Sequence, residues 1–357
     1  YLEASAKSSS AVPEDIVEVA IEVLNRNSEV PIFLESISFK TAKIKNVVYD
    51  VLLENNKKQQ FKQTINLKNL NYTDPYWLQS EGSLGMYQVN ERELIGRPET
   101  PRKATVFFNL LIDTIQITIQ KNIIHRYSRR DKGELYDPFE IVPLVTTKLN
   151  EKVLLFSDAK EKMVKVEVSS GTNNVRGKLL LEVPKDWKVS PAFIDLEIKQ
   201  KGDTQAFQFK ITPTISDSEG TIKSSVLIDD KRFDKELIEI KYDHIPKQTV
   251  LKKSSAKVVR LNIKKTGNFI GYIRGAGDLV PESLKQIGYS VVMINPEEIT
   301  TDNLKKFDAV VLGIRAYNTL PILKYKQKFL LEYVEKGGNM IVQYHTSRRV
   351  DVAAPFK

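Results

Sequence analysis

The sequence predicts a multidomain protein in which two β-sandwich domains precede a small α/β domain with a parallel sheet. Up to residue 245, short segments with strand-like alternation follow one another about every ten residues, which is typical of sandwiches. From residue 266 onward, nearly continuous apolar runs alternate with helical patterns, which indicates βαβ units. A chain of 357 residues is also too long for one ordinary hydrophobic core.

The first sandwich is expected over residues 12–150, after an N-terminal tail at residues 1–11. Its first strand is the run IVEVAIEV at 16–23, where apolar and charged residues alternate. Residues 75–85 interrupt the pattern as an irregular excursion, and the basic and acidic run HRYSRRDKGELYDP at 125–138 is expected to be a loop with ion pairs. Further strands are expected at 30–39, 47–53, 61–67, 105–112, 115–119 and 139–149.

The second sandwich is expected over residues 151–245, and its strand count is typical of an immunoglobulin-like domain. Trp187 lies between two prolines in the run VPKDWKVSP, and we expect it to cap one end of the core. The seven expected strands are 153–156, 163–168, 177–183, 194–198, 205–211, 224–228 and 236–242.

Residues 246–265 carry seven basic side chains and no acidic one. The simpler interpretation is a solvated basic linker with an edge strand that its lysines protect from pairing. The alternative is a docking strip for an acidic neighbouring domain or a polyanion.

The α/β domain is expected over residues 266–357, with strands at 269–273, 289–294, 309–314 and 339–344. A helix begins near Pro281, and a second one at 320–336 ends before Gly337. Because the sequence stops after four strands, we expect the parallel sheet to be incomplete. In such sheets the ligand lies beyond the carboxyl ends of the strands.

Three loops leave that edge, at residues 274–278, 315–318 and 343–347. They are expected to gather Asp278, Arg315, Tyr317, Asn318 and His345 around one crevice, where these groups suit a polar ligand. The alternative is that they are surface polar groups or contacts between domains. No nucleophile and base stand at a catalytic spacing, so no catalytic residue is assigned.

The glycines of the first loop, RGAGD, half match a dinucleotide-binding fingerprint. Val280 stands where the third glycine belongs. They either hold an anion or shorten the turn between strand and helix.

Composition excludes several further classes of function. The net charge is +9, but basic clusters with interleaved aromatic residues are missing, so no nucleic-acid partner is expected. No apolar run is long enough for a membrane span. There is no cysteine, and the three histidines fall in three predicted domains, so no metal or other cofactor is expected in this chain. The oligomeric state stays open.

Several runs stand out together: PYWL at 75–78, ELIGRPE at 93–99, GELYDPFEIVP at 133–143, GYIRGAGDLVPESLKQIGYSV, FDAVVLGIRAYN, and the run from EKGGNMIVQYHTSRR through PFK. In this order they resemble the middle and C-terminal regions of long bacterial PIG-L/LmbE-type deacetylases, typical of Bacteroidetes. LEVPKDWKVSP resembles the immunoglobulin-like domain associated with carbohydrate-binding modules in α-galactosidases. The resemblance implies that residues 266–357 form a flavodoxin/amidotransferase-like domain, similar to class I glutamine amidotransferases. The cysteine of the amidotransferase pair is missing.

In such deacetylases the catalytic unit lies N-terminal to this region. It is a zinc-dependent hydrolase of N-acetyl groups on amino sugars, with a His-Pro-(Asp/His)-Asp-Asp motif that this sequence lacks. The resemblance therefore implies a non-catalytic accessory region that positions the N-terminal catalytic domain or binds glycan. It also assigns the zinc to the catalytic domain. We expect an extracytoplasmic bacterial location, periplasmic or secreted, with which the absence of cysteine is compatible.

Two other functions stay open: an independent enzyme or small-ligand-binding domain that uses the three loops, and a purely structural spacer. Exposed aromatic side chains would favour glycan binding, and Tyr76, Trp77, Tyr87 and Trp187 are the candidates.

Overall fold

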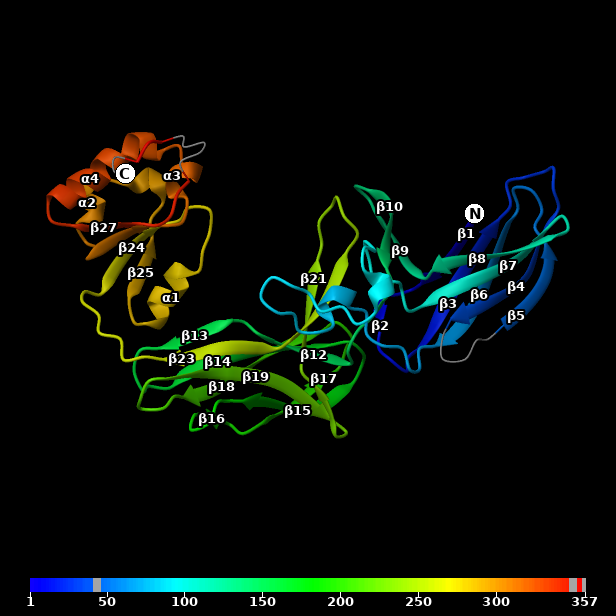
Figure 1. Ribbon diagram of the computed structural model, residues 1–357, viewed down its shortest axis with the longest axis horizontal. Helices are drawn as coiled ribbons and strands as arrows, with labels where there is room; N and C mark the ends of the chain where they lie inside the picture. The colour runs from blue at the N-terminus through cyan, green and yellow to red at the C-terminus, as the bar shows by residue number, and fades with distance from the viewer. Residues whose placement is uncertain (41–45, 347–351, 355–357) are drawn as a thin grey trace.

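The computed structural model of the chain describes residues 1–40, 46–346 and 352–354. Three bodies follow one another along the chain, two built of mainly antiparallel sheets and a third built on a small parallel sheet with few helices (Figure 1). Ser347, which was predicted to belong to the third loop, lies outside the described residues.

Two sheets form the first body and share one apolar core. One sheet has the strand order β10-β9-β1-β3-β6, and the other has the order β5-β4-β7-β8. The elements are β1 (Leu2–Ala6), β2 (Ser10–Ala11), β3 (Ile16–Leu24), β4 (Ile32–Lys40), β5 (Asn46–Leu52), β6 (Lys58–Asn66), η1 (Tyr76–Leu78), η2 (Arg92–Leu94), β7 (Thr105–Ile112), β8 (Ile115–Asn122), β9 (Ile124–Arg129), β10 (Gly133–Pro138) and β11 (Glu140–Ile141).

The N-terminal tail predicted at residues 1–11 is wrong, because this stretch is part of the sandwich. Strand β1 lies between β9 and β3, with Ala4 and Ala6 buried in the core, and β2 pairs with β11. Alanine contributes little to a strand pattern, so the alternation in LEASA is weak at the level of sequence.

The loop predicted at 125–138 is a hairpin formed by β9 and β10. The ion pairs expected there do form. Arg126 lies 3.0 Å from Glu3 and 3.9 Å from Glu134 on the neighbouring strands. Charged side chains on both strands hide the apolar alternation that would have indicated a strand.

The segment 139–149, predicted as one strand that closes the first sandwich, is divided at Pro143. Strand β11 stays with the first body, whereas β12 (Val145–Leu149) pairs with β14 of the second. Val145 and Leu149 accordingly belong to the core of the second body. Proline lacks the N–H group that a continuous strand needs, so the chain passes from one sandwich to the next at this residue.

The second body is also a two-sheet sandwich around one core. Its sheets have the orders β12-β14-β18-β16 and β13-β23-β19-β15-β17, and β20 pairs with β19. The strands are β13 (Val153–Phe156), β14 (Lys162–Ser170), β15 (Val175–Glu182), β16 (Lys188–Ser190), β17 (Ile194–Ile198), β18 (Thr204–Thr212), β19 (Ser218–Ile228), β20 (Lys231–Phe233), β21 (Lys235–Ile240), β22 (Gln248–Lys253) and β23 (Ser255–Arg260).

Two parts of this body differ from the prediction. The strand expected at 236–242 forms β21, which leaves the sandwich and pairs with β22 in a hairpin beside the first body (Figure 1). The linker expected at 246–265 contains β22 and β23, and β23 lies inside the sheet between β13 and β19. Ala256 and Val258 alternate with exposed Lys257, so the basic charge conceals a strand pattern.

The third body has four parallel strands in the order β25-β24-β26-β27. Helix α1 packs on one face of the sheet, against Ile270 and Tyr272, and α4 packs on the other. The strands and both helices lie close to their predicted positions. The elements are β24 (Phe269–Ile273), α1 (Val280–Gln286), β25 (Ser290–Met293), η3 (Pro296–Glu298), α2 (Thr301–Leu304), β26 (Ala309–Leu312), α3 (Ala316–Thr319), α4 (Leu323–Glu335) and β27 (Asn339–Val342).

Candidate functional site

The three predicted loops meet at the carboxyl edge of the parallel sheet. The loop after β24 contacts the loop after β26, since the N–H of Ala276 donates to the carbonyl oxygen of Ile314 at 2.8 Å. The loop after β26 contacts the loop after β27, since the N–H of Arg315 donates to the carbonyl oxygen of Tyr344 at 2.7 Å. The five predicted residues therefore lie on three adjoining loops.

Asp278 is the centre of a hydrogen-bond network at this edge. Its carboxylate accepts a hydrogen bond from the hydroxyl of buried Tyr272 at 2.6 Å. It accepts two more from the backbone N–H groups of Val280 at 3.0 Å and Ile314 at 3.2 Å. Gln343 donates to the same Tyr272 hydroxyl at 2.7 Å. The carboxylate thus joins two of the loops, and Tyr272 links them to the third.

The charge of Asp278 is stabilised by these donors. Burial raises the pKa of the carboxyl, but the hydrogen bonds from Tyr272 and from the backbone outweigh burial, so its pKa lies below the usual range. Burial and the hydrogen bond to Asp278 raise the pKa of Tyr272. Both groups keep their ordinary charges at neutral pH, and neither is adjusted for proton transfer there.

The glycines of the RGAGD loop have a packing role. A Cβ atom on Gly275 would lie 2.2 Å from the carbonyl oxygen of Ile314, so only glycine fits where these two loops meet. Gly277 has φ +109°, a conformation that other residues rarely adopt. Close approach of the two loops therefore requires glycine at 275, and the backbone conformation favours glycine at 277.

Arg315 adopts the left-handed conformation, with φ 57°, and its side chain is exposed. Its backbone nitrogen is engaged with Tyr344, whereas its guanidinium is accessible at the edge of the sheet. Among the five predicted residues it is the one whose charged group faces solvent most fully.

Tyr317, Asn318 and His345 hold the second and third loops together. The Tyr317 ring is fully buried and lies 5.9 Å from the His345 ring, and burial raises the pKa of its hydroxyl. Asn318 donates to the carbonyl oxygen of Thr346 at 3.1 Å and accepts from its N–H at 3.0 Å. The amide of Asn318 is therefore used for loop-to-loop contact.

The arrangement is better suited to holding loops than to catalysis. Four of the five predicted residues contact neighbouring protein groups through their side chains: Asp278, Tyr317, Asn318 and His345. Sequence reasoning missed Tyr272 and underused Gln343, the two polar groups that connect Asp278 to the third loop. A tyrosine among the aliphatic residues of a buried strand was the available signal, because its hydroxyl needs a partner inside the protein.

The second and third bodies are joined by side-chain contacts to the backbone. The Gln286 side chain, at the end of α1, accepts from the N–H of Leu155 at 2.7 Å. Lys162 donates to the carbonyl oxygens of Leu155 and Gln286, both at 2.5 Å, and burial lowers its pKa. Both residues escaped sequence analysis because their partners are backbone groups.

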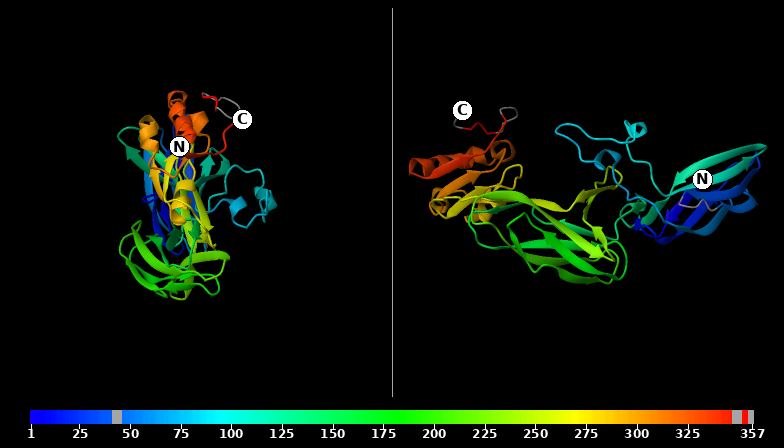
Figure 2. Two further views of the ribbon diagram at one scale, coloured as in Figure 1. Left: turned by 90° about the vertical axis from the view of Figure 1, so that its left-hand side faces the viewer. Right: turned by 60° about the horizontal axis from the view of Figure 1, so that its bottom comes forward.

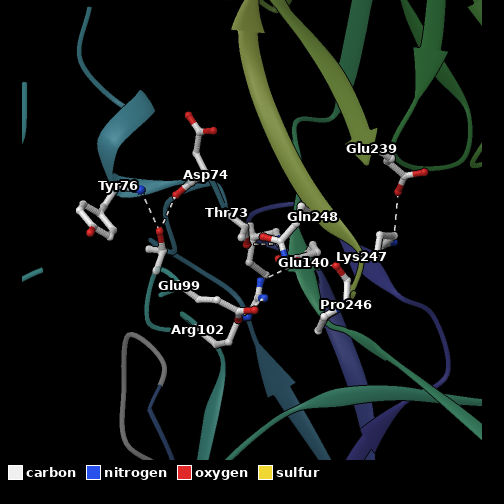
Figure 3. Close-up of polar contacts among 12 residues, drawn as sticks. Thr73, Asp74, Tyr76, Glu99, Arg102, Glu140, Glu239, Pro246, Lys247 and Gln248 are labelled. Atoms are coloured by element: carbon white, nitrogen blue, oxygen red, sulfur yellow. Dashed lines mark hydrogen bonds and ion pairs between the residues drawn. The ribbon is translucent and has the colours of Figure 1, made fainter. Parts of the chain in front are cut away.

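The first and second bodies are joined in a similar way. Asp74, in the segment between β6 and η1, accepts from the N–H of Leu251 in β22 at 3.0 Å, and burial raises its pKa. Lys132 pairs with Asp243 at 2.7 Å, in the turn between β21 and β22. Figure 3 shows Arg102 paired with Glu140 in the first body and Lys247 paired with Glu239 in the β21–β22 hairpin.

A further contact between these bodies comes from Lys201. Its ammonium donates to the hydroxyl of Ser8 at 3.0 Å and to the carbonyl oxygen of Ser10 at 2.5 Å. It also lines a cavity of about 390 Å³ with Glu167, Glu239 and several hydroxyls. Burial lowers the pKa of Lys201.

Within the described residues, no three or more His, Cys, Asp or Glu side chains come together in a way that could hold a metal ion. None of the described helices has the length and apolar character needed to cross a membrane.

The four candidate aromatic platforms separate into two buried and two accessible side chains. Trp187 is 6% exposed, packs edge-to-face on Phe156 at 5.1 Å and donates to the hydroxyl of Ser218 at 3.2 Å. Tyr76 is also buried, and its hydroxyl donates to the carbonyl oxygen of Arg97 at 3.2 Å. Trp187 and Tyr76 are therefore core residues, whereas Trp77 is half-buried and Tyr87 is exposed.

Comparison with known proteins gives distant structural similarity alone. No protein-family model and no curated protein match the chain. A red sea bream transglutaminase structure shares 12% identity over 74% of this chain and 31% of its own, with a TM-score of 0.27. A Salmonella α-2-macroglobulin reacted with methylamine shares 10% sequence identity over 72% of this chain and 16% of its own, with a TM-score of 0.24. The D0–D1 domain of intimin shares 11% sequence identity over 70% of this chain and 96% of its own, with a TM-score of 0.21. The chain thus spans less than a third of the transglutaminase and macroglobulin chains, and similarities at this level assign it to no family.

Proposed function

We propose that this chain is a non-catalytic accessory region of a carbohydrate-active deacetylase of the PIG-L/LmbE type, and that its domains position the catalytic domain. The observation that carries the proposal is the set of side-chain bonds to backbone groups across both domain junctions. Gln286 and Lys162 join the second body to the third, and Asp74 and Lys201 join the first to the second. Such contacts fix the angle between domains, which is what a positioning region requires.

These junction bonds act where water is partly excluded. Lys162, Lys201 and Asp74 are each about half-buried, and burial shifts the pKa of each toward its neutral form. A partly buried polar group that loses its partner is destabilising, so separating the domains costs free energy at each of these groups. The fixed arrangement is therefore favoured over freely jointed domains.

The polar contacts at the carboxyl edge of the third body support the same proposal. Most of the polar side chains at its carboxyl edge hold loops in place, as the contacts of Asp278 and Asn318 illustrate. The order β25-β24-β26-β27 is compatible with a flavodoxin/amidotransferase-like domain that serves without the amidotransferase reaction. In the same proposal the second body is an immunoglobulin-like domain.

The proposal assigns the chemistry to a catalytic domain N-terminal to this chain, which would carry the zinc, in an extracytoplasmic bacterial location. The test is to read the coding sequence upstream of Tyr1. A His-Pro-(Asp/His)-Asp-Asp run encoded there, after a signal peptide, is the expected result. An upstream region without that motif would contradict the assignment.

A polar-ligand site at the three loops is the second candidate, and the exposed guanidinium of Arg315 favours it. Calorimetry of the whole chain with small carboxylates and phosphates tests this candidate, with Arg315→Ala as the variant. Binding that disappears in the variant would support a ligand site. An equal heat of binding in both proteins would exclude a ligand site that uses Arg315.

A further inference from the structure

The excursion between β6 and β7 carries an open cavity of about 450 Å³. Trp77 and Tyr87 both line it, together with Leu78, Met86, the hydroxyl-bearing Ser80 and Ser83, and Gly82 and Gly85. This segment projects away from the first sandwich (Figure 2). The two accessible candidates among the predicted aromatic platforms therefore share one cavity.

The turn that carries Tyr87 is internally braced. Ser83 and Met86 exchange two backbone hydrogen bonds, at 3.0 and 3.2 Å. Gly82 approaches this turn so closely that a Cβ atom there would lie 2.5 Å from the carbonyl oxygen of Met86. Asn90 donates to the hydroxyl of Ser80 at 3.0 Å and ties the returning chain to the same wall.

The other wall is anchored to the protein core. Trp77 lies on the short helix η1 and packs edge-to-face on buried Tyr76, with the ring centres 4.8 Å apart. The N–H of Tyr76 donates to the hydroxyl of Thr100 at 2.8 Å. The position of the indole is therefore set before any ligand arrives, which reduces the entropy lost on binding.

Two large side chains of the tip are accessible to a ligand. Met86 is 72% exposed and Tyr87 is 68% exposed, and they lie beside half-buried Trp77. Among the residues that the structure describes, none with a charged side chain lines the cavity. These features favour a neutral ligand that has an apolar face to lie on an aromatic ring and polar groups to reach serine hydroxyls and glycine backbone.

A pyranose ring has this chemistry, because its C–H groups form apolar faces and its hydroxyls lie around the rim. We propose that Trp77 and Tyr87 form a binding site for a neutral carbohydrate, with Ser80 and Ser83 as partners for ring hydroxyls. A proline-rich peptide also stacks on aromatic side chains, but it offers no hydroxyl rim for the serines. The proposal rests on the accessory role proposed above, and adds a ligand class to it.

The experiment titrates the whole chain with chitohexaose, cellohexaose and maltohexaose and follows tryptophan emission and heat. Only two tryptophans are present, and Trp187 is buried, so a change in emission reports on Trp77. We expect saturable binding of at least one oligosaccharide, weakened about tenfold or more by Tyr87→Ala. Trp77→Phe should abolish the emission change, and Tyr325→Ala, an exposed tyrosine on α4, should leave binding unchanged.

Three results would overturn the proposal: no binding of any of the three oligosaccharides, unchanged affinity in Tyr87→Ala, or binding of decaproline in their place. Circular dichroism checks that Tyr87→Ala is folded, as its exposure leads us to expect. Binding is measured on this chain alone, so failure to bind carbohydrate does not affect the proposal of an upstream deacetylase domain. Equally, absence of the upstream motif does not affect the binding result.

Discussion

The side-chain carbonyl oxygen of Gln286 lies 2.7 Å from the backbone nitrogen of Leu155, and its amide nitrogen lies 3.3 Å from the carbonyl oxygen of Val153. Leu155 and Val153 belong to β13, an edge strand of the second sandwich. The carboxamide of Gln286 therefore occupies the place that the peptide group of a neighbouring strand would take. It covers an open strand edge and, together with the bond from Lys162, holds the third body against the second.

Gln286→Ala should loosen the third body relative to the second. Spin labels at Lys188→Cys and Lys328→Cys, both exposed in the native protein, give the distance between the two bodies without interference, because the chain has no other cysteine. We expect a narrow distance distribution in the parent protein and a broader one in the variant. Gln116→Ala removes an exposed glutamine within the first body and serves as the matched control. Equal widths in all three proteins would show that Gln286 does not set the angle.

Asp278 should make the third body sensitive to acid. Its folded-state pKa lies below the ordinary value of 3.8, so its contribution to stability is complete above that value. The contribution is lost as the pH falls through the folded-state pKa. Asp278→Asn should lower the free energy of unfolding of this body by about 1.5–3 kcal/mol at neutral pH, the usual range for a charged hydrogen-bonded group.

Hydrogen exchange within β24 and β26 measures this effect for the third body separately from the sandwiches. The difference between parent and Asp278→Asn should shrink as the pH is lowered through the folded-state pKa of the Asp278 carboxyl, which lies below its ordinary value. A difference that is independent of pH would mean that the charge of Asp278 is not what stabilises the loops.

Trp187→Ala should destabilise the second sandwich by about 3–5 kcal/mol, since it removes a buried indole and leaves a cavity beside Phe156. Urea unfolding followed by circular dichroism measures the loss. Phe193→Ala, an exposed aromatic residue of the same body, is the control and should change stability little. Similar losses in the two variants would contradict a core position for Trp187.

Gly275→Ala should disturb the contact between the first and second loops of the third body. Its Cβ atom would approach the carbonyl oxygen of Ile314 to 2.2 Å, so one loop must move, at a cost of about 1–3 kcal/mol. Thermal unfolding and the amide spectrum of residues 274–278 would report the change. Full stability would mean that the loops tolerate separation, and the glycine would need another explanation.

The period-two and apolar patterns predicted most strands, because burial on one or both faces leaves a direct mark on sequence. Strand β24 was located at its true boundaries, since Phe269–Ile273 is almost wholly apolar. Strand β1 was missed because alanine marks a buried position weakly. Strand β23 was missed because the lysines near Ala256 and Val258 make the segment look like a basic linker. These lysines face solvent, whereas Ala256 and Val258 are buried.

The sequence predicted where the three loops of the candidate site meet, but it did not predict what their side chains do there. Parallel strands bring their carboxyl ends together, so the meeting of the three loops follows from the sheet alone. That Asp278 would accept bonds from Tyr272 and from the backbone of Ile314 depends on loop geometry, which sequence does not encode locally. The junction residues Gln286 and Lys162 were missed for the same reason.

The central claim, that this chain is a fixed frame, is tested most directly by small-angle X-ray scattering of the whole chain. We expect one arrangement of the three bodies, that of Figure 1, to reproduce the scattering curve at both low and high salt. Salt is the relevant variable because it weakens exposed pairs such as Lys132–Asp243, while the half-buried bonds of Gln286 and Lys201 persist. A curve that requires many arrangements, with a larger maximum dimension, would contradict the account.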